Sequence, residues 1–480
     1  MVEDNKSLNK LALKSGFWYV ISSVLITASA TLTTPIFTRL LTQAEYGKVA
    51  NFNSWYTMIA AFCNLNLTFS VGRAKLDYPQ QLDKFIGCMQ LLALIPSSII
   101  SALIISFIKP ISVFWGIPTI GVIFLTINLL SVPAIEFYLN GSRYMYRYKE
   151  SIAISWFTTF GSIAISLLLI LSINNNNDVN RIIGIVIPNL LISIYIWIKT
   201  IKKGYIIYNK EWWTYGLKLS LPLVVHTLSL NILSQSDRAF ITNICGSQNT
   251  AVYSIAYSYG NLILVVTSAV ANGWLPWFHD KYYQGKFEEI RKNTVKMVVL
   301  GAYVGLACIA FAPEAIMILG GKTYINAQYC VAPIALGIFC QFVYTHYVNI
   351  EMHLKKTKYV PIGTILAALI NIILNAIFIP RFGYTGAAYT TFFSYLILMV
   401  VHFLITKRIL HISVYNNMFM FCAVLMTTTI GLLLVFIYNY SIIRYCLTII
   451  GFCSFVYYFR ENIFSFIRNK LNKQENNMYT

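Results

Sequence analysis

Charged residues are scarce in this chain, and acidic residues are the scarcest. Charged residues make up 11% of the 480 positions, and 17 Asp and Glu stand against 36 Lys and Arg. Hydrophobic residues make up 57%, and the mean hydropathy is +0.64. A soluble protein of this length could not bury so much apolar surface, so the composition predicts an all-α polytopic membrane protein.

Motifs for catalysis and metal binding are also missing. The sequence has no P-loop, zinc-ligand spacing, nucleophile elbow or kinase signature. The loops between the apolar runs are short, which leaves no room for a soluble catalytic domain. Most of the nine cysteines lie inside apolar runs and are interpreted as packing residues. We therefore expect a protein that is not an enzyme and that holds no metal or cofactor.

The net charge of +19 could indicate nucleic-acid binding, but Lys and Arg are spread over short loops instead of being gathered in one domain. Most of them fall in alternate loops and in the termini, the pattern typical of the cytoplasmic side of a membrane protein. The charge distribution therefore predicts no nucleic-acid partner, and it places both termini in the cytoplasm.

Fourteen apolar runs are long enough to cross a bilayer, although Pro and polar residues within several of them leave a count of twelve open. The predicted spans are residues 16–40, 48–71, 85–108, 118–139, 151–173, 181–199, 215–240, 252–276, 295–319, 328–351, 359–380, 384–406, 416–438 and 441–459. We expect an N-lobe of six helices over residues 1–200 and a C-lobe of six over 201–412. Two extra helices over 413–460 and a basic cytoplasmic tail over 461–480 complete the chain.

The run from Leu217 to Tyr259 carries polar and charged residues to membrane depth, where a central charge costs roughly 2.5–3.5 kcal/mol on insertion scales. At about 100° per residue, one stripe of this helix holds several of them. The stripe comprises Thr227, Asn231, Ser234, Gln235, Arg238 and Thr242, with His226 and Asp237 beside it. Such a stripe must face a partner helix or a watery cavity.

The same polar pattern recurs near the N-terminus. A shift of 204 residues places Ser23, Thr27, Thr31, Thr34 and Thr38 on Thr227, Asn231, Gln235, Arg238 and Thr242. In the next helices Tyr46, Asn53 and Asn64 correspond to Tyr253, Asn261 and Asn272. We interpret the halves as parallel repeats whose first two helices face a central cavity. Asn64, Asn261 and Asn272 are therefore candidate cavity residues.

Charged residues within the spans are candidates for substrate binding and ion coupling. Arg39 and Arg238 are expected to make the cavity electropositive, although snorkelling to headgroups would also explain them. Glu136, His226 and Asp237 are candidates for coupling to an ion, with a helix–helix hydrogen bond as the alternative for His226. Asp237 has no evident partner. Glu314 and Glu351 lie near span ends, where we expect them to be solvated or paired.

A second group of cations lies on the predicted cytoplasmic side. Arg73 and Lys75 follow the second span, and Arg143 and Arg147 alternate with tyrosines after the fourth. Arginine holds phosphate oxygens bidentately, so these residues could capture a phosphate at the inner leaflet. A topology signal combined with an aromatic belt is the alternative interpretation.

Four pairs of segments carry a family resemblance. They are Pro35–Leu41 with Glu45–Gly47, Arg143–Tyr144 with Tyr148–Lys149, Gln235–Arg238 with Val252–Tyr257, and Asn375–Pro380 with Gly383–Ala388. On these segments, over nearly its whole length, the chain resembles the polysaccharide transporter family of the multidrug/oligosaccharidyl-lipid/polysaccharide exporter superfamily. That family comprises flippases for O-antigen and capsular repeat units.

The resemblance implies two six-helix lobes around a central cavity, with two extra C-terminal helices. It implies a substrate made of an oligosaccharide on polyprenyl (undecaprenyl) pyrophosphate, moved from the cytoplasmic to the outer face of the bacterial inner or plasma membrane. A proton or sodium gradient would drive alternating access. Arg39, Arg238 and the inner cations would suit the pyrophosphate, and the polar stripes would suit the sugars. Membrane lipids, a polysaccharide polymerase and glycosyltransferases are the partners it implies.

Three other functions remain as alternatives. A lipid II flippase would share the fold and a cationic groove. A cation-coupled multidrug antiporter would be expected to place acids in its cavity, whereas Arg is prominent here. A membrane polymerase or glycosyltransferase would need a large external loop or an acidic nucleotide-sugar motif, and the sequence has neither.

Overall fold

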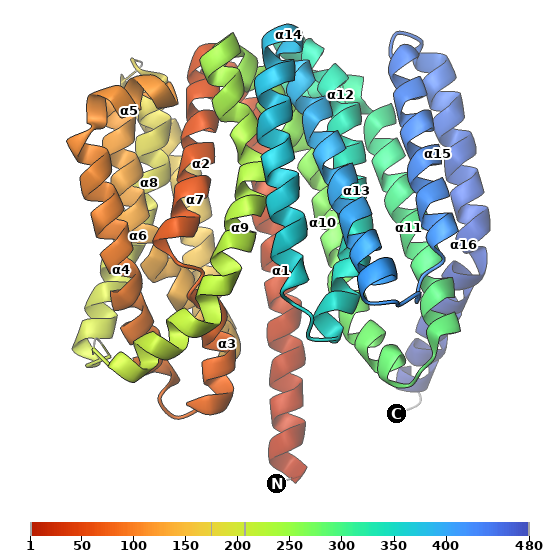
Figure 1. Cartoon of the computed structure of the whole chain (residues 1–480), viewed down its shortest axis with the longest axis horizontal. Helices are drawn as coiled ribbons and strands as arrows, with labels where there is room; N and C mark the ends of the chain where they lie inside the picture. Colours follow the sequence, from red (N-terminus) through yellow and green to blue (C-terminus); the bar gives the residue numbers. More distant parts are fainter. Residues whose placement is uncertain (1, 174, 206–207, 479–480) are drawn as a thin grey trace.

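The computed structural model describes residues 2–173, 175–205 and 208–478, and within these ranges the chain is helical with no β-strand (Figure 1). The first half contains α1 (Val2–Leu40), α2 (Gln43–Cys63), α3 (Thr68–Asp77), α4 (Leu82–Ser106), α5 (Ile108–Trp115), α6 (Thr119–Tyr144), α7 (Tyr148–Ile173) and α8 (Asn177–Lys202). The second half contains α9 (Lys210–Cys245), α10 (Ser247–Tyr283), α11 (Phe287–Ala310), α12 (Ala312–Gly320), η1 (Lys322–Ala327), α13 (Gln328–His353), α14 (Tyr359–Leu404), η2 (Ile405–Ile409), α15 (Asn417–Phe436) and α16 (Ser441–Met478).

Twelve helices in the described ranges are long and apolar enough to cross a membrane. One of these ranges, Tyr359–Ile409, contains the two spans predicted at 359–380 and 384–406. Gly383 lies between them with φ 62° and ψ −150°, and the side chains of Thr390 and Asn375 hydrogen-bond to each other. A straight helix would separate positions 375 and 390 by about 22 Å. The chain therefore reverses at Gly383 and forms two antiparallel limbs of α14.

The second predicted span differs from the structure, because it is broken. Residues 48–71 were expected to form one helix, but α2 ends at Cys63 and α3 begins at Thr68. The turn between them contains Leu65 and Asn66, both with positive φ. This segment is not among the twelve apolar helices. The break leaves α2 as a short helix whose end opens toward the centre of the molecule.

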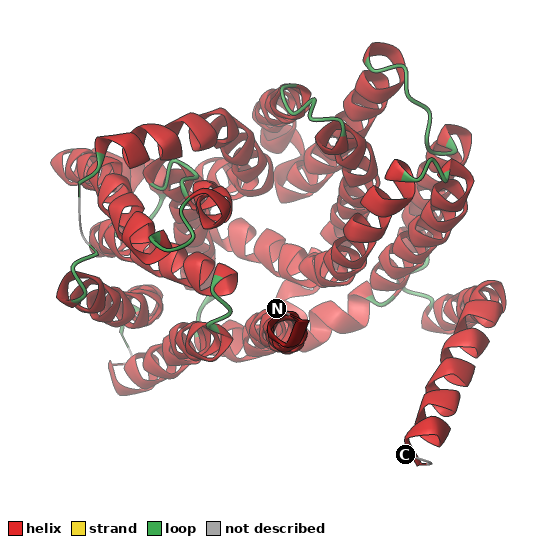
Figure 2. Cartoon of the chain, turned by 90° about the horizontal axis from the view of Figure 1, so that it is seen from below, coloured by secondary structure: helices red, strands yellow, loops and turns green. Residues whose placement is uncertain are grey.

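The helices form two groups, which we call the N-lobe (α2–α8) and the C-lobe (α10–α16), with α1 and α9 between them (Figures 1 and 2). Helix α9 packs against α2 on one side and α14 on the other. Its first turns pack on the N-lobe, because the rings of Trp212 and Tyr215 lie 5.8 and 5.9 Å from the ring of Phe85. Helix α9 therefore bridges the lobes.

Two polar contacts join helices of the C-lobe. Glu351 and His402, both fully buried, are 2.8 Å apart and join α13 to α14. Arg444 of α16 forms a bidentate pair with Glu314 of α12. Glu314 and Glu351 were expected to be either solvated or paired, and the structure shows both of them paired. Each contact joins two helices and so stabilises the packing of the lobe.

The chain ends lie at one end of the bundle, which we call the terminal end (Figure 1). At the opposite end the lobes touch. Thr38 donates a hydrogen bond of 2.7 Å to the carbonyl of Leu319, and Gln43 donates one of 2.8 Å to the carbonyl of Thr323. Gly47 of α2 approaches α10 so closely that a Cβ there would lie 1.7 Å from the carbonyl oxygen of Ser247. The junction between the lobes is therefore closed at the opposite end.

Candidate functional site

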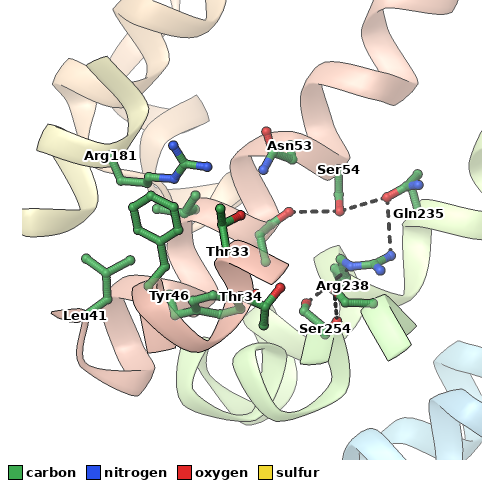
Figure 3. A pocket seen from close by; sticks show the side chains of 14 residues that line it. Thr33, Thr34, Leu41, Tyr46, Asn53, Ser54, Arg181, Gln235, Arg238 and Ser254 are labelled. Atoms are coloured by element: carbon green, nitrogen blue, oxygen red, sulfur yellow. Dashed lines mark hydrogen bonds between the residues drawn. The ribbon is translucent and has the colours of Figure 1, made fainter. Parts of the chain in front are cut away.

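A cavity of about 230 Å³ lies between the lobes near the opposite end, and we call it the arginine chamber (Figure 3). Helices α1, α2, α8, α9 and α10 supply its walls. The lining residues are Thr33, Thr34, Phe37, Leu41, Tyr46, Val49, Ala50, Asn53, Ser54, Arg181, Gln235, Arg238, Ser254 and Ser258. The predicted polar stripe of α9 thus contributes Gln235 and Arg238 to this cavity, and the corresponding part of α1 contributes Thr34.

Arg238 is held against α9 and α10 with 8% of its surface exposed. Its Nη1 donates to the carbonyl of Ser234 at 3.1 Å and to Oε1 of Gln235 at 3.2 Å. Its guanidinium lies 4.4 Å from the ring centre of Tyr257. Among the described residues no carboxylate lies within 4.0 Å of it. The hydrogen bonds that position this arginine are thus accepted by neutral groups.

The second arginine of the chamber is Arg181, on the far side from Arg238 (Figure 3). It lies in the first turns of α8, and its Nη1 donates to Oγ of Ser166 at 2.6 Å. Its guanidinium stacks 3.9 Å from the ring centre of Phe37. No described carboxylate pairs with it either. Arg181 opens the predicted span 181–199 and was not among the candidates named from the sequence.

Arg39 was expected in this chamber but lies outside it. Its side chain is exposed and donates to the carbonyl of Pro35 at 2.9 Å, while its neighbours Phe37 and Thr38 turn inward. The predicted electropositive cavity is therefore built from Arg181 and Arg238. Two guanidinium groups in one chamber, neither paired with an acid of the described ranges, favour an anion that accepts several hydrogen bonds.

A second cavity of about 290 Å³ lies nearer the terminal end, and we call it the glutamate chamber. It is lined by Tyr56, Thr57, Ala60, Ala61, Asn64, Asn66, Thr68, Glu136, Thr227 and Asn231. Three sequence candidates, Asn64, Glu136 and Asn231, thus come together here. The side-chain amide of Asn64 donates to the carboxylate of Glu136, and Asn231 Nδ2 donates to the carbonyl of Thr57 at 3.2 Å.

The two chambers follow one another along the interface of α2 and α9. Between them Ser54 of α2 donates to Oε1 of Gln235 of α9 at 3.1 Å. Arg238 and Asn231 line different chambers and are seven residues apart on α9, a rise of about 10 Å. The interface therefore presents cations toward the opposite end and a carboxylate toward the terminal end.

Asp237, whose partner the sequence did not reveal, lies inside the C-lobe. It is fully buried and accepts hydrogen bonds from Tyr253, from Thr391 at 2.6 Å and from Asn375 at 2.7 Å. Asn371 extends this group by accepting from Asn375 at 3.1 Å. Because Asp237 and Arg238 differ by about 100° around α9, one faces the C-lobe and the other the chamber.

The remaining candidates of the polar stripes lie outside both chambers. His226 contacts Thr364 of α14, with Nδ1 and Oγ1 3.0 Å apart. Asn261 and Asn272 of α10 line neither chamber, and Asn272 is exposed. The predicted repeat pairs Asn261 and Asn272 with Asn53 and Asn64. Asn53 and Asn64 each line a chamber, whereas their counterparts do not.

The four inner cations divide into two kinds. Arg73 is 3.1 Å from Asp77, and the pKa of Asp77 is lowered by a hydrogen bond from Tyr215 and by Arg73. Arg147 forms a bidentate pair with Asp83 at 2.8 and 2.9 Å, which raises the pKa of this arginine. Lys75 and Arg143 have no described carboxylate within 4.0 Å. The paired aspartates partly neutralise Arg73 and Arg147. These two arginines should therefore bind phosphate more weakly than the unpaired cations that the sequence predicted.

Two sequence families match this chain. The profile described as "Polysaccharide biosynthesis protein" matches residues 12–282, and the MatE profile matches residues 222–377. A "Probable low-salt glycan biosynthesis flippase Agl15" of Haloferax volcanii is 24% identical over 185 residues, 37% of this chain and 39% of that protein. The "Capsular polysaccharide biosynthesis protein CapF" of Staphylococcus aureus is 26% identical over 203 residues, 40% and 49% of the two chains. The matched regions thus span less than half of each curated relative.

Solved structures share the fold at low identity. The lipid II flippase MurJ in an inward closed conformation superposes with a TM-score of 0.70 at 14% identity, over 92% of this chain and 99% of that one. An inward-facing multidrug resistance MATE family transporter of the MOP superfamily gives 0.57 at 14%, over 83% and 94%. With the family profile matching more than half of its length, the chain belongs to the polysaccharide biosynthesis protein family and has the fold of the MOP superfamily transporters.

Proposed function

We propose that this protein is a flippase for an oligosaccharide linked to a polyprenyl pyrophosphate, working in the cell membrane in the synthesis of a surface polysaccharide such as O-antigen or capsule. The observation that carries the proposal is the pair Arg181 and Arg238 on opposite sides of one chamber without an acidic partner. A pyrophosphate offers several anionic oxygens to such a pair. The family match and the flippase names of its relatives support the same substrate class.

In this proposal the protein works by alternating access, and the closed junction between the lobes at the opposite end supports it. With both termini in the cytoplasm, the glutamate chamber lies nearer the cytoplasmic side and the arginine chamber nearer the outside. The substrate enters from the cytoplasm, its lipid tail stays in the bilayer, and a change in lobe orientation exposes the headgroup outside. A lipid II flippase is the second candidate, favoured by the high structural similarity to MurJ. The paired arginines argue against a carrier of cationic drugs.

Deleting the gene in its host and staining for surface polysaccharide tests the function. We expect the polysaccharide to be lost and its lipid-linked repeat unit to accumulate on the inner face, with both restored by the intact gene. Unchanged polysaccharide would refute the proposal. Rescue of a host depleted of its lipid II flippase, with no effect on surface polysaccharide, would favour the second candidate instead.

Coupling to a proton or sodium gradient uses Asp237 in this proposal, with His226 as a neighbouring candidate on the same helix. Asp237 is surrounded by amide and hydroxyl groups of both limbs of α14 and of α10. Oxygen atoms of this kind suit a hard cation, and a buried carboxylate also suits a proton. Because the site joins three helices of the C-lobe, its occupancy can bias how the lobe packs against α9.

The variant Asp237→Asn keeps the shape of this group and removes its charge. We expect purified Asp237→Asn protein in liposomes to bind lipid-linked oligosaccharide as the wild type does, while an imposed proton or sodium gradient no longer accelerates flipping. Transport measured with and without each gradient checks this, and Glu288→Gln, which changes an exposed acid, is the matched control. Undiminished acceleration in Asp237→Asn would exclude this residue from coupling.

A further inference from the structure

The break between α2 and α3 is strained in a way that points to a binding site. Leu65 and Asn66 are consecutive non-glycine residues with φ of 44° and 50°. Left-handed backbone costs a residue of this kind roughly 1–2 kcal/mol, so surrounding contacts must hold the turn. One such contact is the hydrogen bond of 3.3 Å from Asn66 Nδ2 to Thr227 of α9. Interrupted helices in transporters commonly line substrate or ion sites at the interface of the two halves.

The turn brings amides around an acid that lacks a cation. Glu136 of α6 is exposed to the glutamate chamber, and its carboxylate accepts a hydrogen bond from Asn64. No described Lys, Arg or His nitrogen lies within 4.0 Å of it. The carbonyl oxygen of the Asn64 side chain is buried and accepts no hydrogen bond. The chamber thus offers an exposed negative charge at membrane depth, where a charge is costly without a partner.

From this arrangement we propose that the glutamate chamber binds a positively charged amino group carried by a sugar of the transported glycan. The proposal rests on the proposed function and names the class of glycan. An ammonium group donates three hydrogen bonds, and the Glu136 carboxylate together with side-chain oxygens of the chamber lining can accept them. The adjoining arginine chamber binds the pyrophosphate of the same molecule. The headgroup is therefore zwitterionic, with its cationic sugar close to the pyrophosphate along α9.

An inorganic cation fits the chamber less well. Hard metal ions require about six oxygen ligands at roughly 2.0–2.6 Å in a tight cage. The chamber holds one acid in about 290 Å³, and no group of three or more His, Cys, Asp or Glu suited to a metal occurs in the described part of the chain. A sugar bearing an amino group both fills the space and hydrogen-bonds to Asn66 and Asn231.

Two synthetic probes differing in one group test the proposal. Both are disaccharides on farnesyl pyrophosphate, one with a free amino group on the first sugar and one with that group N-acetylated. Binding to the full-length protein in nanodiscs is measured by calorimetry. We expect the amino probe to bind at least about tenfold more tightly to the wild type, because a desolvated charge pair is formed. Glu136→Gln should abolish this preference and leave the N-acetylated probe unaffected.

Further variants separate the outcomes. Glu136→Asp keeps the charge and should retain part of the preference, while Glu288→Gln should change nothing; thermal unfolding checks that all variants are folded. Equal binding of both probes by the wild type, or a preference that persists in Glu136→Gln, would overturn the inference. The inference would also be overturned if the protein bound sodium in a way that requires Glu136 and showed no preference for the amino probe. Failure of both probes to bind would overturn the proposed function itself. If both probes bound equally and their binding required Arg238, the inference would fail while the proposed function would stand.

Discussion

Replacing Arg181 and Arg238 together with Ala is expected to abolish flipping and to weaken binding of the pyrophosphate headgroup by at least about 30-fold per arginine. This factor corresponds to about 2 kcal/mol, the lower range for removing one member of a desolvated charge pair. Both guanidinium groups line the same chamber, and neither is neutralised by a described carboxylate. Their charge therefore remains available to a bound anion.

The single variants and one control make this result specific. Arg238→Lys should retain part of the activity, because it keeps the charge but loses the planar fork. Arg39→Ala removes an arginine of the same region that is exposed outside the chamber, and it should export normally. Export is followed by surface polysaccharide staining, and headgroup binding by calorimetry. Full activity of Arg238→Ala would remove this residue from the binding site.

The same variants should not destabilise the protein. An arginine buried without an acidic partner costs free energy of desolvation that its hydrogen bonds to neutral groups only partly offset. Arg181→Ala and Arg238→Ala should therefore unfold at the wild-type temperature or above it. A variant that loses function but unfolds at the same or a higher temperature has lost a binding residue. Replacing a residue needed for packing would instead lower the unfolding temperature.

Replacing Gly47 with Val is expected to prevent closure of the lobes at the opposite end and to reduce transport to background. A Cβ at Gly47 would lie 1.7 Å from the carbonyl oxygen of Ser247 and 2.6 Å from its carbon. Both atoms belong to the backbone of α10, so no side-chain rotation can relieve the overlap. The lobes must separate there, and the protein is held in the state that is open at this end.

Cross-linking measures this effect directly. Gln43 of α2 reaches the carbonyl of Thr323 of η1, so cysteines at these two positions should be joined by a short bifunctional thiol cross-linker in a background without the native cysteines. Gly47→Val should remove the cross-link. Gly305→Val is the matched control, because Gly305 has nothing within 4 Å of its added Cβ. A cross-link and transport at wild-type levels in Gly47→Val would contradict the gating role of this contact.

Much of the architecture could be predicted from hydrophobic runs. The two limbs of α14 were expected as separate spans because Pro380 and Gly383 interrupt an apolar run that is too long for one crossing. The break after Cys63 was not expected. The run 48–71 contains neither Pro nor Gly, and the left-handed conformation of Leu65 and Asn66 depends on contacts with α9 that no local pattern records.

The candidate site was predicted in part. The periodicity of α9 placed Gln235, Arg238 and Asn231 on one face, and that face lines the two chambers. Periodicity gave no information on which helix stands opposite. Arg181 was therefore missed and Arg39 was put in its place, although the two residues look alike in sequence as cations at span ends.

The lengths of the apolar runs and the helical period were enough to identify a membrane protein of many helices and the polar face of α9, because both are local properties. Which charges meet depends on how the helices pack. Asp237 joins α10 and α14 in the C-lobe, Arg238 faces Arg181 across a chamber, and Glu136 meets Asn64 at the break in α2. These partners lie on different helices, so the packing of the helices sets the distances between them.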